Sequence, residues 1–218
     1  MVNEHVQQLL RSALEFLSLP SAESASGVKI QTQTVLVLDT STSMHRHGYD
    51  ASRLAAAKEA ALAFIRNRSA SGLKGKIAVV AFATGALTVC PLTDVKGRKK
   101  LESTIRSIQA DGDTNIAAGL IMAEQLFADS EDSESEREVV LLSDGANNSR
   151  ENPVHAANRL KCSGCRIHTI GIGTGAEVDE NLLRELASTG QDGRRLYEFI
   201  GDKGGLIKHF ESIGGLTR

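Results

Sequence analysis

The 218-residue chain has no tryptophan, and only 4% of its residues are aromatic. Stacking platforms for single-stranded nucleic acid need several aromatic rings, so this scarcity argues against that class of protein. The chain also lacks an excess of basic residues, because 25 Lys and Arg are balanced by 27 Asp and Glu. We therefore expect no broad basic surface for nucleic-acid phosphates, and no nucleic-acid partner.

Cysteine, basic leader residues and long apolar runs are scarce as well. Three cysteines cannot form an even disulfide framework, which is typical of a protein from a reducing compartment. The segment from Met1 to Pro20 lacks a basic leader, and polar residues interrupt its apolar ones, so it does not resemble a signal peptide. No apolar run approaches the length of a membrane span. We expect a cytoplasmic protein without a membrane span.

The N-terminal region differs in composition from the rest of the chain. Apolar residues from Val6 to Leu17 recur at helical spacing, which predicts an amphipathic helix over residues 3–18. Pro20 and a segment rich in Ser, Ala and Gly up to Gly27 indicate a linker. The sequence therefore predicts an N-terminal helix and linker at 1–27 and one globular domain at 28–218. The helix could pack on that domain or dock a partner.

Predicted strands and helices alternate along the globular domain. Most of the predicted strands are continuous apolar runs, which are typical of strands buried on both faces, and two are weaker patterns. The predicted strands are Val35–Leu38, Lys76–Thr84, Ala86–Cys90, Val139–Leu142, Arg166–Ile172 and Leu196–Ile200. Helical periodicity and capping residues predict helices from Asp50 or Ser52, at Val95–Gln109, at Ile116–Phe127, from Pro153, at Asn181–Ala187 and at Lys203–Ile213.

This alternation predicts an α/β fold. It favours a doubly wound, Rossmann-like, mostly parallel six-stranded sheet with helices on both faces, plus the N-terminal helix. The connection at Gly85 is too short for a crossover, so Ala86–Cys90 should be an antiparallel edge strand, ended by Pro91.

Hard oxygen donors follow the first buried strand. Asp39 comes directly after the apolar run, and the hydroxyls of Ser41 and Ser43 follow at alternate positions. Open α/β sheets bind their ligands beyond the carboxyl ends of the strands. Oxygen donors without soft sulfur favour Mg²⁺, Mn²⁺ or Ca²⁺ over Zn²⁺ or Cu⁺. The sequence thus indicates a candidate site for a hard divalent ion.

Two later segments complete a pattern that resembles a known family. DTSTS at Asp39, Ser41 and Ser43, the threonine of GDTN (Thr114) and the aspartate of LLSDG (Asp144) are similar to the metal-ion-dependent adhesion site of a von Willebrand factor type A domain. The resemblance covers about 34–213. It implies that the first and fourth strands are neighbours, which would bring the two aspartates together.

One position departs from the family pattern. Relatives often have glycine at the position of Thr42. This residue is a spacer between the two serines, so the departure leaves only the conformation of the loop open.

The resemblance implies a metal-dependent interaction module that is not an enzyme. Mg²⁺ is the expected ion, with Mn²⁺ or Ca²⁺ as alternatives, held directly or through water by Asp39, Ser41, Ser43, Thr114 and Asp144. In the family, an acidic side chain of a partner protein fills the open position on the ion. Cytosolic single-domain relatives suggest an accessory subunit of an intracellular assembly, for example with an AAA-type ATPase, by analogy alone.

Further patterns keep alternatives open. Gly171–Ala176 satisfies G-x-G-x-x-A, so a dinucleotide-dependent enzyme is the alternative function, together with a metal-dependent hydrolase. That fingerprint belongs to the first strand of a dinucleotide-binding domain, however, and here it follows the fifth. Cys162 and Cys165 form C-x-x-C at the end of a helix, whereas a redox pair opens one. His45 and His47 are expected to be exposed loop residues beside the site.

Overall fold

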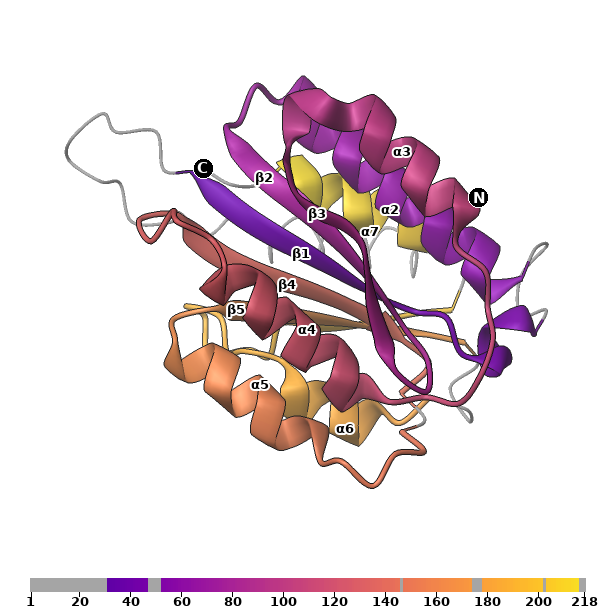
Figure 1. The fold of residues 1–218 in the computed structure, drawn as a ribbon. Helices are drawn as coiled ribbons and strands as arrows, with labels where there is room; N and C mark the ends of the chain where they lie inside the picture. The colour runs from indigo at the N-terminus through magenta and orange to yellow at the C-terminus, as the bar shows by residue number, and fades with distance from the viewer. Residues whose placement is uncertain (1–30, 47–51, 146, 174–177, 202, 216–218) are drawn as a thin grey trace, which may run out of the picture.

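The computed structural model describes residues 31–46, 52–145, 147–173, 178–201 and 203–215 (Figure 1). These residues form one six-stranded sheet in the order β3-β2-β1-β4-β5-β6. The predicted helix at 3–18 and the boundary between 27 and 28 lie outside the described residues, so the division into 1–27 and 28–218 stays a prediction.

The sheet is mixed, with parallel strands at its centre. The parallel strands are β1 (Thr32–Asp39), β2 (Gly75–Phe82), β4 (Glu136–Ser143), β5 (Arg166–Ile172) and β6 (Tyr197–Ile200). Strand β3 (Ala86–Asp94) pairs with β2 in the antiparallel direction at one edge. The predicted doubly wound, Rossmann-like architecture with one antiparallel edge strand is confirmed.

The edge strand corrects one prediction. Strand β3 continues past Pro91 to Asp94, so the prediction that Pro91 ends it is wrong. Its pairing with β2 is irregular there, because Ile77 pairs with Thr93 whereas Val79 pairs with Cys90. Proline has no N–H to donate to a ladder, and edge strands and bulges are the places in a sheet that tolerate this loss.

In the described part of the chain, helices cover both faces of the sheet (Figure 1). One face carries α2 (Arg53–Ala70), α3 (Arg98–Ser107) and α7 (Lys203–Gly215), and the other carries α4 (Ile116–Ala128), α5 (Pro153–Cys162) and α6 (Glu180–Leu186). Two short 3₁₀ turns, η1 (Thr42–His45) and η2 (Val95–Gly97), complete the described elements. The helix predicted from Val95 therefore begins as a 3₁₀ turn. Among the described residues, no helix combines the length and apolarity that crossing a membrane requires.

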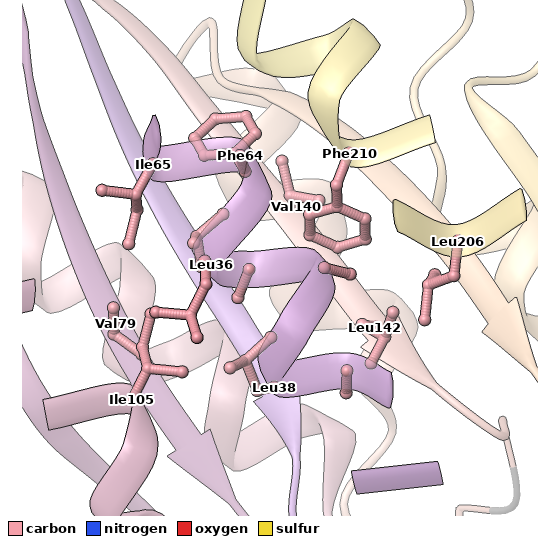
Figure 2. Packing of buried hydrophobic residues seen from close by; sticks show 14 of the residues in the cluster. Leu36, Leu38, Phe64, Ile65, Val79, Ile105, Val140, Leu142, Leu206 and Phe210 are labelled. Carbon is pink, nitrogen blue, oxygen red and sulfur yellow. The ribbon is translucent and has the colours of Figure 1, made fainter. Parts of the chain in front are cut away.

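Alternating side chains of the central strands fill the two cores. Leu36 and Leu38 of β1 belong to the core under α2 and α7, whereas Val35 and Val37 belong to the core under α4. Figure 2 shows the first core, in which Phe64 of α2 and Phe210 of α7 meet edge to face with ring centroids 6.3 Å apart.

This two-sided burial positions the strand ends. A slip of one residue would turn every apolar side chain of β1 toward the wrong face, so the register with its neighbours is strongly specified. Leu38 pairs with Leu142 of β4. The next residues along the two strands, Asp39 and Ser143, therefore emerge side by side at the carboxyl edge of the sheet.

Candidate functional site

Asp39 is the last residue of β1 and is fully buried. Its carboxylate is buried, and both of its oxygens accept hydroxyl hydrogen bonds. Ser41 Oγ donates to Oδ1 at 2.6 Å, and Ser143 Oγ donates to Oδ2 at 2.6 Å. The backbone N–H of Ser41 donates to the same Oδ1 at 2.8 Å. Asp39 thus ties the end of β1 to the end of β4.

Burial also changes the proton affinity of this carboxylate. It raises the pKa of Asp39 to about 6, although the hydrogen bonds from Ser143 and Ser41 act in the opposite direction. The negative charge of Asp144 adds to the rise in this pKa. The two carboxylates therefore lie close enough to repel each other when both are ionised.

The two serine hydroxyls of the first loop lie next to each other. Ser41 Oγ and Ser43 Oγ are 3.0 Å apart. Because Ser41 donates its hydroxyl proton to Asp39, Ser43 is the donor of the hydrogen bond between the two serines, and Ser41 Oγ accepts it and keeps one further lone pair. Oxygens at neighbouring corners of an Mg²⁺ octahedron, each about 2.1 Å from the ion, lie about 3 Å apart. The observed spacing fits two adjacent ligands of such a shell.

Thr42 between them closes the first loop against the loop before α4. Its backbone N–H and its Oγ1 both donate to the carbonyl oxygen of Gly112 at 2.9 Å. In return, the N–H of Asp111 donates to the carbonyl oxygen of Thr40 at 2.8 Å. In the described ranges, no residue other than glycine has a positive φ. Thr42 therefore replaces the glycine of relatives without backbone strain.

Thr114 comes from that second loop and is buried beside the first. Its carbonyl oxygen accepts the N–H of Asn148 at 2.9 Å, and the following residue, Asn115, donates its N–H to the carbonyl oxygen of Ala83 at 2.8 Å. The side chain of Asn115 also caps α4 by accepting the N–H of Ala118 at 3.0 Å. The position of Thr114 is thus fixed from both sides.

Asp144 follows β4 and is 2% exposed. Its Oδ2 lies 3.4 Å from Nη1 of Arg53, the first residue of α2, which is also 2% exposed. The next residue, Gly145, has φ +79°, and a Cβ there would lie 2.9 Å from the backbone N of Asp179. Glycine is required at this turn because both the dihedral angle and the close approach exclude a side chain.

These residues border one cleft of about 570 Å³. Its lining comprises Ser41, Thr42, Ser43, Arg46, Arg53, Asp111, Gly112, Asp113, Thr114, Asp144 and Asn148. Asp39, which accepts hydrogen bonds from Ser41 and Ser143, is not part of the lining. The structure thus brings all five residues singled out in the sequence to one place, at the carboxyl ends of β1 and β4.

The donor set is poor in carboxylates. Within the described ranges, no group of three or more His, Cys, Asp and Glu side chains is arranged to hold a metal ion. The converging set has two carboxylates and three hydroxyls. Any ion in the cleft would therefore depend on hydroxyl oxygens and water for most of its shell.

Sequence reasoning missed two residues that contact the aspartates. Ser143 directly precedes Asp144, and its place beside Asp39 follows once β1 and β4 are known to be neighbours. Arg53 had no such signal, because a basic residue in the first turn of a helix is usually exposed.

The remaining sequence patterns are the glycines that begin at Gly171, the two cysteines of C-x-x-C and the histidines beside the site. A Cβ at Gly171 would lie 3.0 Å from Cγ1 of Val178 and 3.2 Å from Oη of Tyr197, so packing accounts for this glycine. The thiols of Cys162 and Cys165 are free, and burial raises the pKa of Cys165 to about 12. His45 is exposed, as expected, with Nε2 3.0 Å from the carbonyl oxygen of Ala110. Residues 47 and 174–177 lie outside the described residues.

Comparison with known proteins decides the family. The family model of the von Willebrand factor type A domain matches residues 34–147, more than half of the chain. The chain belongs to the von Willebrand factor type A domain family. Domains of this family typically mediate protein–protein interactions.

Individual relatives agree with this assignment. The chain is 29% identical over 205 residues to the calcium-activated chloride channel regulator 1 of Bos taurus; the match covers 93% of this chain and 21% of that protein. This chain therefore spans about a fifth of the bovine relative.

Solved structures share the fold. The conserved hypothetical protein BatB from Bacteroides thetaiotaomicron superposes with a TM-score of 0.70 at 19% identity, covering 85% of this chain and 98% of that one. Proximal thread matrix protein 1 from the mussel byssus, solved with zinc in its metal-ion-dependent adhesion site motif, gives 0.70 at 21% identity, covering 86% of this chain and 48% of that one. At these identities the likeness concerns the fold alone.

Proposed function

We propose that this von Willebrand factor type A domain is a non-enzymatic, metal-dependent protein-interaction module. A divalent cation in the cleft would capture the Glu or Asp side chain of a partner protein. The observation that supports this most strongly is the convergence of three hydroxyls and two carboxylates: Ser41, Ser43, Thr114 and Asp144 line the cleft, and Asp39 accepts a hydrogen bond from Ser41.

Burial and hydrogen bonding give the five residues different roles in binding the ion. Ser41, Ser43 and Thr114 would supply neutral oxygens from the lining of the cleft. Asp144 would supply a carboxylate directly or through water. Asp39 would contribute negative charge and hold the hydroxyl of Ser41 in place, because its two oxygens accept hydrogen bonds from Ser41 and Ser143.

The charges favour a cation at this place. A divalent ion about 4 Å from one carboxylate gains roughly 8 kcal/mol before desolvation, at an effective dielectric constant near 20. The raised pKa of Asp39, which follows from its burial, indicates a carboxylate whose ionised form lacks sufficient compensation. Neutral hydroxyl donors would leave the bound ion electrophilic, so it would favour an anionic ligand from outside.

The contacts of the two buried aspartates argue against either of them as a catalytic base. A hydrolase would need a base within reach of a metal-bound water. Asp39 already accepts hydrogen bonds on both oxygens, and Asp144 is ion-paired with Arg53. Packing accounts for Gly171, the first glycine of the G-x-G-x-x-A pattern, and the described part of that pattern gives the dinucleotide alternative no support.

The chemistry of the donors bears on which ion the cleft would hold. Mg²⁺ leads because the donors are hard oxygens, and Mn²⁺ or Ca²⁺ are alternatives. The mussel relative was solved with zinc in its motif, so Zn²⁺ belongs in any titration as a competitor. A cytoplasmic location is a proposal that rests on the composition of the sequence, and a place in an assembly with an AAA-type ATPase is one that rests on analogy with family members.

A peptide selection tests the partner class without knowledge of the partner. The immobilised chain would be exposed to displayed random peptides in Mg²⁺, and bound peptides would be eluted with EDTA. We expect Glu or Asp to be enriched at one position. Thr114→Ala should abolish the enrichment, and Ser103→Ala, which removes an exposed hydroxyl from α3, should not. Peptides retained in EDTA, or selected equally by Thr114→Ala, would contradict the proposal.

A further inference from the structure

Arg53 is an arginine buried in the wall of the candidate metal site. It is 2% exposed, whereas arginine is almost never fully buried unless it is paired. Its Nη1 lies 3.4 Å from Oδ2 of Asp144. A Cβ at Gly173 would lie 3.3 Å from its Cζ, so the guanidinium rests against the chain just beyond β5.

Helix α2 holds this side chain in place. Ser52 caps the helix by accepting the N–H of Ala55 at 3.2 Å, and the N–H of Arg53 donates to the carbonyl oxygen of Arg46 at 3.2 Å. The first turn of α2 is therefore tied to the end of the loop that carries Ser41 and Ser43. Arg53 enters the cleft from a rigid element, which keeps its charge at a fixed place.

The charge of Arg53 changes the electrostatic balance of the cleft. Arg53 supplies one positive charge beside Asp144, in a cleft that Arg46, Asp111 and Asp113 also line. With Arg53 present, the site carries one more positive charge than it would with a neutral residue at position 53, both before and after a divalent cation binds. The guanidinium therefore opposes the cation and favours an anion at the same place.

We infer that Arg53 is a built-in counter-ion that holds Asp144 in the absence of metal and competes with the divalent cation for it. This inference rests on the proposed function and concerns its regulation. Arg53 weakens the binding of the cation alone, and the carboxylate of a partner removes that penalty. By linkage, the cation and the acidic ligand then strengthen each other's binding by the same factor.

Substitution of Arg53 separates this role from a merely structural one. Arg53→Met removes the charge and keeps a long side chain, whereas Arg53→Lys keeps the charge. Calorimetric titration of the metal-free chain with Mg²⁺ should show that Arg53→Met binds about tenfold more tightly than wild type. Arg53→Lys should stay within about threefold of wild type. Equal or weaker binding by Arg53→Met, or a tenfold gain in Arg53→Lys, would overturn the inference.

Stability provides a second readout that does not depend on titration heats. Without metal, Arg53→Met should unfold at a lower temperature than wild type, because Asp144 loses its counter-ion. Saturating Mg²⁺ should restore its unfolding temperature and raise it more than in wild type. If Arg53→Met is unfolded without metal, circular dichroism should show that Mg²⁺ folds it. A variant that stays unfolded in saturating Mg²⁺ would overturn the inference.

Acetate serves as the probe for the acidic ligand. At equal ionic strength, replacing chloride with acetate should tighten Mg²⁺ binding in wild type and have a smaller effect in Arg53→Met. An equal effect in both would remove the coupling role. If neither wild type nor any variant bound Mg²⁺, the proposed function itself would fail, and this outcome differs from Mg²⁺ binding that is indifferent to residue 53.

Discussion

At the scale of single residues, the buried carboxylate of Asp39 makes the stability of the metal-free protein depend on pH. Its folded pKa of about 6 lies above the ordinary 3.8, so the folded state binds this proton more tightly than the unfolded chain. The stabilisation is complete below pH 3.8 and is lost as the pH rises through 6. The loss amounts to about 3 kcal/mol.

Asp39→Asn tests this expectation, because asparagine cannot ionise. Urea unfolding of metal-free protein between about pH 4 and 7 should show that the difference in stability between wild type and Asp39→Asn changes by about 3 kcal/mol. Wild type should lose stability relative to the variant as the pH rises, and Mg²⁺ at neutral pH should recover the loss. A constant difference across this range would show that Asp39 titrates normally.

A second residue-scale prediction concerns the glycine after Asp144. Gly145 and Gly164 have nearly the same φ, +79° and +81°, but a Cβ would meet Asp179 at the first and nothing within 4 Å at the second. Gly164→Ala should therefore cost about 1 kcal/mol from backbone strain alone, and Gly145→Ala about 1–2 kcal/mol more. Thermal unfolding measures both.

The same pair separates strain from function. Gly145→Ala should also weaken Mg²⁺ binding, because the displaced turn carries Asp144, whereas Gly164→Ala should leave it unchanged. Equal costs in stability and unchanged Mg²⁺ binding for both variants would show that the turn at Gly145 does not position the site.

At the scale of elements, Glu138 joins β4 to β5 and α2. Its Oε1 lies 2.9 Å from Nε2 of His168 and its Oε2 lies 3.4 Å from Nη2 of Arg68. Burial alone would raise the pKa of Glu138, but the hydrogen bond from His168 and the charges of His168 and Arg68 outweigh it and lower this pKa to about 2. The group therefore stabilises the fold above pH 4.5, and that contribution is lost as the pH falls toward 2.

Glu138→Gln should remove this part of the acid sensitivity. At neutral pH the variant should be less stable by on the order of 3 kcal/mol, and the difference should shrink as the pH approaches about 2. Glu136→Gln, which changes a half-exposed carboxylate at the start of the same strand, should stay within about 1 kcal/mol of wild type. Chemical denaturation at several pH values provides the comparison. A difference that persists in strong acid would mean that packing rather than charge is responsible.

Element boundaries show which parts of the fold the sequence can predict. The buried strands were visible because an uninterrupted apolar run such as Val35–Leu38 is typical of a strand covered on both faces of a sheet. The end of β3 could not be predicted from the sequence, because a strand can continue through Pro91 only where its pairing is irregular at the edge of the sheet. The sequence predicts a helix from Val95, but residues 95–97 form a 3₁₀ turn where the chain leaves the edge strand β3.

At the scale of the whole molecule, the site exists because the sheet reverses its winding between β1 and β4. Composition and periodicity located Asp39 and Asp144 at the ends of strands, and the family resemblance supplied the strand order that makes them neighbours. The partners of the two aspartates were not predictable in full. Ser143 required the register of β4, and Arg53 required the path of α2 over the sheet.

The central claim is that five side chains together hold a divalent cation: Asp39, Ser41, Ser43, Thr114 and Asp144. Calorimetric titration of the chelator-treated chain with Mg²⁺ tests this claim most directly. One ion should bind per chain, and at about a hundredfold its dissociation constant it should add about 2.7 kcal/mol of stability. Asp39→Asn should bind at least about tenfold more weakly, whereas Asp113→Asn, which alters an exposed carboxylate of the same cleft, should stay within about threefold. Absence of Mg²⁺ binding in wild type, or equal binding by Asp39→Asn, would contradict the account.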